Sequence, residues 1–222
     1  MIARIDGETL CLILQRGDDG LAHLVWFGPK NNDVMARAPH FQRLPASPDV
    51  PVGPTLHPAH GHGFHNIAQV EAHCHKTRRL LRLKPPEFAA SDRQITLNSH
   101  DDSLGVRVVT TMTFRGDALV VTCCLHNDGE TNIDVTRAAS LLIPTPDWAS
   151  RLVTWAGAWG REGQYTERLW STGRVEQLGR TGRPGFDGGP TLSLLENGAN
   201  VAEGRWLTAH LAWSGAFRLA AE

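Results

Sequence analysis

The chain has 222 residues and a net charge of −1, with 22 Lys and Arg against 23 Asp and Glu. It lacks the basic surplus that binding to a phosphate backbone requires, so we expect no nucleic-acid partner. The N-terminus shows no charged segment followed by an apolar run, and no stretch approaches the ~20 apolar residues of a membrane span. We therefore expect a cytoplasmic chain without membrane contact.

The first elements read as short strands. Apolar runs at 8–16 and 21–27 flank a Gly-Asp-Asp-Gly turn and predict a hairpin. Six prolines between 38 and 58 then indicate a long loop, because proline has no N–H to donate to a neighbouring strand.

The clearest strand signal follows in the middle of the chain. Residues 105–115 alternate in character, and Gly116-Asp117 leads into a second run at 118–126. Glycine at the first central position of a two-residue loop favours a type II′ turn, so we predict a second hairpin here. A strand over 133–142, ended by Pro144 and Pro146, is expected next.

The C-terminal part repeats short runs at spacings typical of an antiparallel sandwich or barrel. They lie at 151–155, 164–169, 175–179, 191–195, 205–211 and 216–220. No segment has a sustained helical stripe, so we predict an all-β chain with little helix, forming one β-sandwich domain over residues 1–222.

The four cysteines indicate reduced, small apolar residues rather than a disulfide framework. No C-x-x-C occurs, and the neighbours Cys123 and Cys124 would point to opposite faces of a strand.

Aromatic residues concentrate in one stretch. Four of the seven tryptophans fall between Trp148 and Trp170, and residues 153–162 read V-T-W-A-G-A-W-G-R-E. Tryptophan can either fill a core or offer a flat face to a ligand. Both interpretations stay open, but we predict that Trp155 and Trp159, four residues apart on a strand or turn, do not share one environment.

Histidines form the second concentration. Six of the eleven lie between His57 and His75. Neutral imidazole is a common ligand for zinc, copper or nickel, but the spacing matches no familiar metal motif. We expect no metal and no cofactor, with His60, His62 and His65 as weak metal-ligand candidates. The alternative is a polar loop whose imidazoles bond to backbone.

No catalytic residue can be assigned from motifs. There is no G-x-S-x-G elbow, and spacing alone does not identify the two carboxylates of a glycosidase among scattered Asp and Glu.

The tryptophan stretch carries a family resemblance. Residues 155–162 (W-A-G-A-W-G-R-E) resemble the S-G-A-W-x-R-E stretch in the N-terminal domain of family 36 glycoside hydrolases, the α-galactosidases. Residues 10–28, 114–127 and 213–217 resemble further pieces of that domain in the same order. The resemblance implies a β-supersandwich, as in galactose mutarotase, placed ahead of a catalytic (β/α)8 barrel with both catalytic aspartates. No βα pattern occurs here, so we expect the barrel to be absent and this chain alone to be inactive.

The same resemblance points to a loop that can reach a neighbouring subunit's active site through G-x-G-D-x-R-E. The aligned residues are Gly61, His62, Gly63, Phe64, His65, Asn66 and Ile67, so the family's Asp, Arg and Glu are replaced. With Trp155 and Trp159, residues 61–66 are the tentative substrate-binding set.

Three functions remain open. The first is an N-terminal domain that supports the barrel, a homo-oligomer and the rim of a site for α-galactoside-type sugars. The second is a free-standing carbohydrate-binding module. The third is a mutarotase-like epimerase with a histidine acid and a glutamate base.

Overall fold

The computed structural model describes residues 1–33, 55–60, 67–171, 173–180 and 188–222. The regular elements of these residues are all β-strands, and every strand pair is antiparallel. This confirms the predicted all-β class. The chain divides into two compact units, Met1–Pro144 and Thr145–Glu222.

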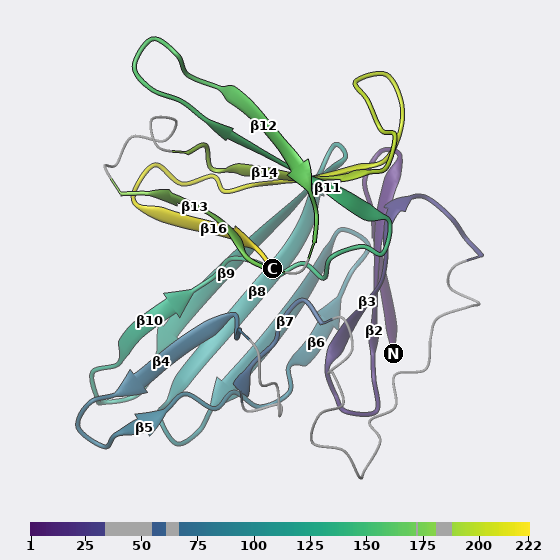
Figure 1. Ribbon diagram of the computed structural model, residues 1–222. Coiled ribbons are helices and arrows are strands. Elements are labelled where there is room, and N and C mark those ends of the chain that lie inside the picture. Colours follow the sequence, from purple (N-terminus) through teal and green to yellow (C-terminus); the bar gives the residue numbers. More distant parts are fainter. Residues whose placement is uncertain (34–54, 61–66, 172, 181–187) are drawn as a thin grey trace. The chain divides into compact units, whose positions relative to one another are not determined.

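The described residues of the first unit form three sheets, with strand orders β1-β2-β3, β6-β7-β8-β9 and β10-β4-β5, and Figure 1 labels all of these strands except β1. Their strands are β1 (Ile2–Asp6), β2 (Leu10–Arg16), β3 (Ala22–Pro29), β4 (Val70–Cys74), β5 (Arg79–Leu80), β6 (Glu87–Ala90), β7 (Gln94–Asp101), β8 (Val106–Arg115), β9 (Ala118–Asn127) and β10 (Asp134–Ala138).

Two buried clusters hold this unit together. One joins the inward residues of β1, β2, β7 and β8, including Ile5, Leu12 and Ile95. The other is formed by inward residues of β4 and β8 and includes Val70, Cys74 and Val108.

The hairpin predicted around Gly116 is confirmed as β8 and β9, with Arg115 opposite Ala118. Gly116 has φ 59°, and Asp117 is not among the described non-glycine residues with positive φ. A type I′ turn needs positive φ at both central residues, so this combination leaves the predicted type II′ turn.

The Asp117 carboxylate fastens this turn to the loop before β2. It accepts hydrogen bonds from the backbone N–H of Thr9 (2.6 Å) and Leu10 (2.9 Å), and from the Thr9 hydroxyl (2.6 Å). The Thr9 hydroxyl and these backbone donors lower the pKa of Asp117, because they favour the ionised form.

The strand expected over 133–142 is shorter than predicted. β10 ends at Ala138, and the next N–H, of Ala139, donates to the Gln69 carbonyl (2.9 Å) before the prolines are reached. Because Ala138 lies opposite Val70, this bond is the last step of the same register, and the pairing ends there.

β7 was missed by the sequence pattern. Its inward positions are Ile95, Leu97, Ser99 and Asp101, all buried. Two of the four are polar, so the apolar alternation that marks a half-buried strand is interrupted.

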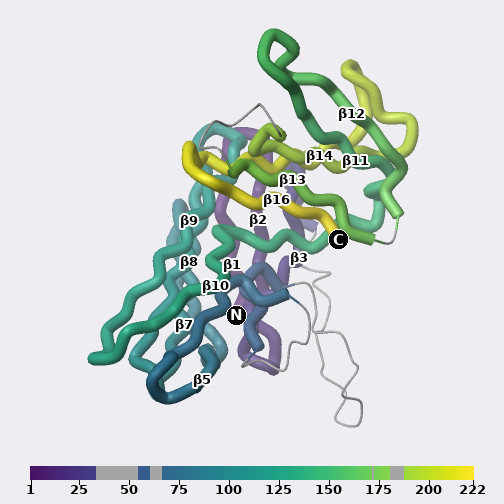
Figure 2. The backbone as a smooth tube through the Cα atoms, turned by 60° about the vertical axis from the view of Figure 1, so that its left-hand side comes forward, coloured from purple at the N-terminus to yellow at the C-terminus, as the bar shows by residue number. Residues whose placement is uncertain are grey.

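The second unit contains a four-stranded sheet of order β12-β11-β14-β15 and the separate pair β13-β16. Figure 2 shows β13 and β16 running side by side. Their strands are β11 (Ala149–Ala156), β12 (Gln164–Leu169), β13 (Val175–Gly179), β14 (Thr191–Glu196), β15 (Trp206–His210) and β16 (Phe217–Ala221). All six coincide closely with the short runs predicted from sequence.

The described residues of this unit include two small buried apolar clusters. Leu152, Leu192 and Leu194 make one, and Val153, Leu195 and Ala199 make the other. Most of β12 and β15 is exposed.

All four cysteines are free thiols. Cys11 and Cys74 are buried, Cys123 is half-buried and Cys124 is exposed. Burial raises the pKa of the Cys123 thiol, because a thiolate would be desolvated there. The two neighbours on β9 therefore face opposite sides, as predicted.

Candidate functional site

The tryptophan stretch lies on the hairpin of β11 and β12, which we call the aromatic hairpin (residues 149–169). β11 is central in its sheet and β12 is the edge strand. The buried side chains of Leu152 and Val153 anchor β11, whereas every residue of β12 is exposed. β11 is thus packed into the unit, and the neighbouring strand β12 is open to solvent.

Trp155 lies on β11 close to the turn of this hairpin. Its half-buried ring packs against the cluster of Val153, Leu195 and Ala199. The ring also meets Tyr165, its partner across the hairpin, edge to face at 6.2 Å between centroids and 78° between planes. Its carbonyl accepts hydrogen bonds from Gln177 Nε2 (3.0 Å) and the Gly189 N–H (2.7 Å), which fixes the backbone.

Trp159 lies in the turn, and its side chain is 80% exposed. The N–H of Arg161 donates to the Ala158 carbonyl (2.8 Å), and Gly160 and Gly163 take positive φ of 72° and 68°. The Glu162 carboxylate accepts from the Gly160 N–H (3.0 Å). The prediction that Trp155 and Trp159 differ in environment is confirmed, so they do not form one flat platform.

Trp170, which follows β12, packs against the cluster of Leu152, Leu192 and Leu194. It therefore belongs to the core. Tyr165 and Leu169 are 51% and 80% exposed, so they accompany Trp159 as exposed large side chains of the hairpin.

One ion pair joins the two strands of the hairpin. Glu167 pairs with Arg151 Nη1 (2.6 Å) and accepts a hydrogen bond from the Tyr165 hydroxyl. The Tyr165 hydrogen bond and the Arg151 charge lower the pKa of Glu167, and the same hydrogen bond raises the pKa of Tyr165. Glu167 is thus held as a carboxylate, unsuited to act as a general acid.

The histidine segment splits into different environments. His57 is fully buried, with Nε2 2.9 Å from the Ser99 hydroxyl and Nδ1 bonded to Gln69. Gln69 Nε2 donates onward to Thr110 Oγ1 and to the Ser140 carbonyl (3.3 Å each). His57 is therefore a satisfied core residue, and its ring bonds to the side chains of Gln69 and Ser99.

His60 is exposed, with Nε2 3.7 Å from Glu71 Oε1. Arg137 Nε lies 3.4 Å from the same oxygen. The Glu71 carboxylate is thus shared between His60 and Arg137.

The remaining loop candidates, Gly61, His62, Gly63, Phe64, His65 and Asn66, lie outside the described residues. Their predicted role in substrate binding stays a prediction.

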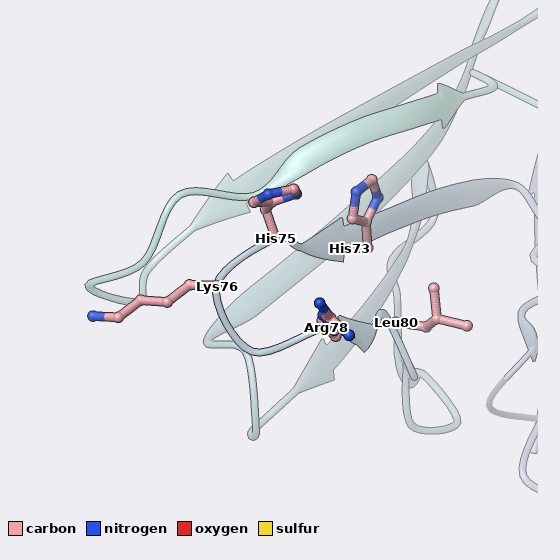
Figure 3. A pocket seen from close by; sticks show the side chains of 5 residues that line it. All are labelled: His73, His75, Lys76, Arg78 and Leu80. Carbon is pink, nitrogen blue, oxygen red and sulfur yellow. The ribbon is translucent and has the colours of Figure 1, made fainter.

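Two further histidines of the segment from His57 to His75, outside the three weak metal candidates, converge with an aspartate. His73 and His75 lie with Asp134 so that one ligand atom from each is within 4.8 Å of the others. Figure 3 shows both imidazoles on the same side of β4. Asp134 was missed because it lies some sixty residues further along the chain and joins the group only through the β4–β10 pairing.

No helix of the described residues is long and apolar enough to cross a membrane.

The sequence matches the family model of the glycosyl hydrolase family 36 N-terminal domain over residues 25–222. The chain therefore belongs to this family. Among curated proteins, no match to the sequence was found.

Solved structures of the same family share the fold. The α-galactosidase AgaA from Geobacillus stearothermophilus matches 99% of this chain with a TM-score of 0.84 at 19% identity. The α-galactosidase from Lactobacillus brevis matches 99% with a TM-score of 0.81 at 14% identity. The galactosidase domain of the α-galactosidase–sucrose kinase AgaSK matches 100% with a TM-score of 0.84 at 16% identity.

These matches cover only 34% to 35% of the three longer chains. The chain thus spans about a third of their length and has the fold of their N-terminal part, in agreement with the predicted supersandwich. AgaA variants have been crystallised with stachyose and with raffinose.

Proposed function

We propose that this chain is the non-catalytic N-terminal domain of an α-galactosidase-like hydrolase, where it supports a catalytic barrel that acts on α-galactosides. The observation that carries the proposal is the family match over residues 25–222. The fold likeness to the N-terminal third of α-galactosidases supports it.

Hydrolysis of a nitrophenyl α-galactoside tests this assignment. The 222-residue chain should show no turnover, because we assign both catalytic aspartates to the barrel. A longer protein in which the barrel follows this chain should release nitrophenol. Turnover by the 222-residue chain would contradict the proposal.

Within this role, we assign the contact surface to the exposed side chains of the aromatic hairpin. Trp159, Tyr165 and Leu169 are large exposed side chains of this one hairpin, and exposed apolar surface marks interaction sites. A second copy of the chain, in a homo-oligomer, is the occupant we propose.

Sedimentation equilibrium tests the oligomer. Leu169→Ser should shift the chain toward monomer, because it removes exposed apolar area from the interface. Val201→Ser, on a loop outside the hairpin and at least as exposed as Leu169, is the control. If both variants keep the wild-type mass, or if the wild type is already monomeric, the interface is not at the hairpin.

A sugar-binding role is the second candidate, favoured by the exposed indole of Trp159. An exposed aromatic face can stack on a pyranose ring. Titration of tryptophan fluorescence with galactose, melibiose and raffinose should give a saturable change that Trp159→Ala removes. Trp213→Ala, which changes another exposed tryptophan, should leave it intact. Absence of any change at high millimolar sugar would exclude this role.

A further inference from the structure

We propose that His73, His75 and Asp134 form a zinc-binding site on the first unit. This inference is independent of the proposed function, since it concerns a different surface and a different ligand.

The strand pairing brings the three side chains together. In β4 the residues Val70, Ala72 and Cys74 point into the core, so His73 lies on the opposite, outward face. His73 pairs across the ladder with Asp134 of the edge strand β10. His75 opens the turn that follows β4, and one of its ring nitrogens lies within 4.8 Å of the ligand atoms of His73 and Asp134.

The distances suit one small cation. His73 Nε2 lies 3.7 Å from Asp134 Oδ2, and one ligand atom from each of the three residues lies within 4.8 Å of the others. Tetrahedral zinc with bonds of about 2.0–2.2 Å holds its ligand atoms roughly 3.3–3.6 Å apart. Small rotations of exposed side chains close this difference without moving the backbone.

The donor set selects the kind of metal. Two imidazole nitrogens and one carboxylate oxygen suit zinc better than magnesium or calcium, which prefer oxygen ligands alone. Three protein ligands leave a fourth tetrahedral position for water. A bound ion would join the edge strand β10 to the central strand β4, so it would stabilise the folded sheet.

The three side chains are open to solvent, and a neighbouring arginine makes an anion the alternative ligand. His73 and His75 line a shallow pocket of about 570 Å³ together with Lys76, Arg78 and Leu80. Lys76 extends away from the imidazoles (Figure 3). Arg78 contributes a positive charge that opposes a cation and would favour an anion, whereas the Asp134 carboxylate favours the cation.

Isothermal titration of the full chain with zinc chloride tests the site. We expect one Zn²⁺ per chain, and His73→Asn or His75→Asn should each weaken binding by at least about tenfold. Asp134→Asn should weaken it as well. His100→Asn is the matched control, because His100 also lies near an aspartate (Asp102, 3.2 Å) but is outside the cluster. This variant should bind zinc with the wild-type affinity.

The variant Arg78→Asn distinguishes a cation site from an anion site. Arg78 has φ 53°, a conformation that asparagine tolerates, so the loop should keep its shape. Removal of this charge should tighten zinc binding. Binding of inorganic phosphate that weakens in Arg78→Asn, without zinc binding by the wild type, would identify an anion site and overturn the proposal.

Thermal unfolding supplies a readout that does not rely on stoichiometry. Excess zinc should raise the Tm of the wild type and of His100→Asn, and should leave that of His75→Asn unchanged. Circular dichroism confirms that each variant is folded. Equal zinc affinity in the wild type, His73→Asn and His75→Asn would overturn the site, as would an equal loss in His100→Asn.

Discussion

At the scale of single residues, buried polar groups hold the turns of the first unit. Asp101, at the end of β7, is buried and accepts hydrogen bonds from the Ser103 hydroxyl (2.6 Å) and from the N–H groups of Arg82 (2.7 Å), Ser103 (2.8 Å) and Leu104 (3.2 Å). Burial raises the pKa of Asp101, but these four hydrogen bonds outweigh it and the net shift is downward.

We predict that Asp101→Ala lowers the free energy of unfolding by about 2–3 kcal/mol at pH 7, because buried N–H donors lose their acceptor. Urea unfolding measures the loss. Asp92→Ala, at an exposed position, should change stability by less than about 0.5 kcal/mol.

The contribution of Asp101 should also depend on pH. Its folded pKa lies below the unfolded value of about 3.9, so the stabilisation is fully present above that value and is lost as pH falls through the folded pKa. The difference between wild type and Asp101→Ala should therefore shrink in acid. A difference that stays constant from pH 7 to pH 2 would contradict this linkage.

At the scale of elements, the β13–β16 pair depends on a glycine. Gly179 lies opposite Phe217, and a Cβ at Gly179 would come within 2.2 Å of the Phe217 ring. The ring thus occupies the space that a side chain would need. Phe217 is buried, so it has little freedom to move aside.

We predict that Gly179→Ala destabilises the chain by about 1–3 kcal/mol through overpacking. Gly188→Ala is the control, because its Cβ would make only ordinary contacts with Gln177, at 3.5 Å or more. Chemical denaturation of the single and double variants with Phe217→Ala measures the coupling. Strictly additive losses would show that the ring and the glycine do not interact.

The sequence predicted elements well where side chains alternate or where glycine defines a turn. The β8–β9 hairpin and the six strands of the second unit follow from such signals. β7 was missed because Ser99 and Asp101 face inward, and β10 is shorter than predicted because its pairing with β4 stops near Gln69, far away in the sequence. Pairing between distant segments leaves no local signal.

The same limit applies to the candidate site. Local sequence singled out Trp155 and Trp159, and their different environments followed from their spacing. Asp134 comes close to His73 and His75 only because β10 pairs with β4, about sixty residues away in the sequence. This pairing cannot be read from a single sequence.

At the scale of the whole molecule, the two units differ in how much they bury. The first has large clusters under several sheets, whereas the second has two small clusters and an exposed edge strand. Small units with few buried side chains are marginal alone. We therefore propose that residues 1–222 fold as one domain.

We predict a single cooperative transition in calorimetry, with equal calorimetric and van't Hoff enthalpies. Leu12→Ala in the first unit and Leu152→Ala in the second, both at fully buried positions, should each lower the same Tm, since either removes about 2–5 kcal/mol. Two separate transitions, each shifted by only one variant, would show that the units unfold independently.

The unequal burial of the cysteines makes the chain easy to tag. Cys124 is the one exposed thiol of the four, and the raised pKa of half-buried Cys123 slows its reaction, because the thiolate is the reactive form. A maleimide fluorophore or spin label should therefore attach at a single known position on β9 without any mutation. A label there would report distances from this chain to whatever it assembles with.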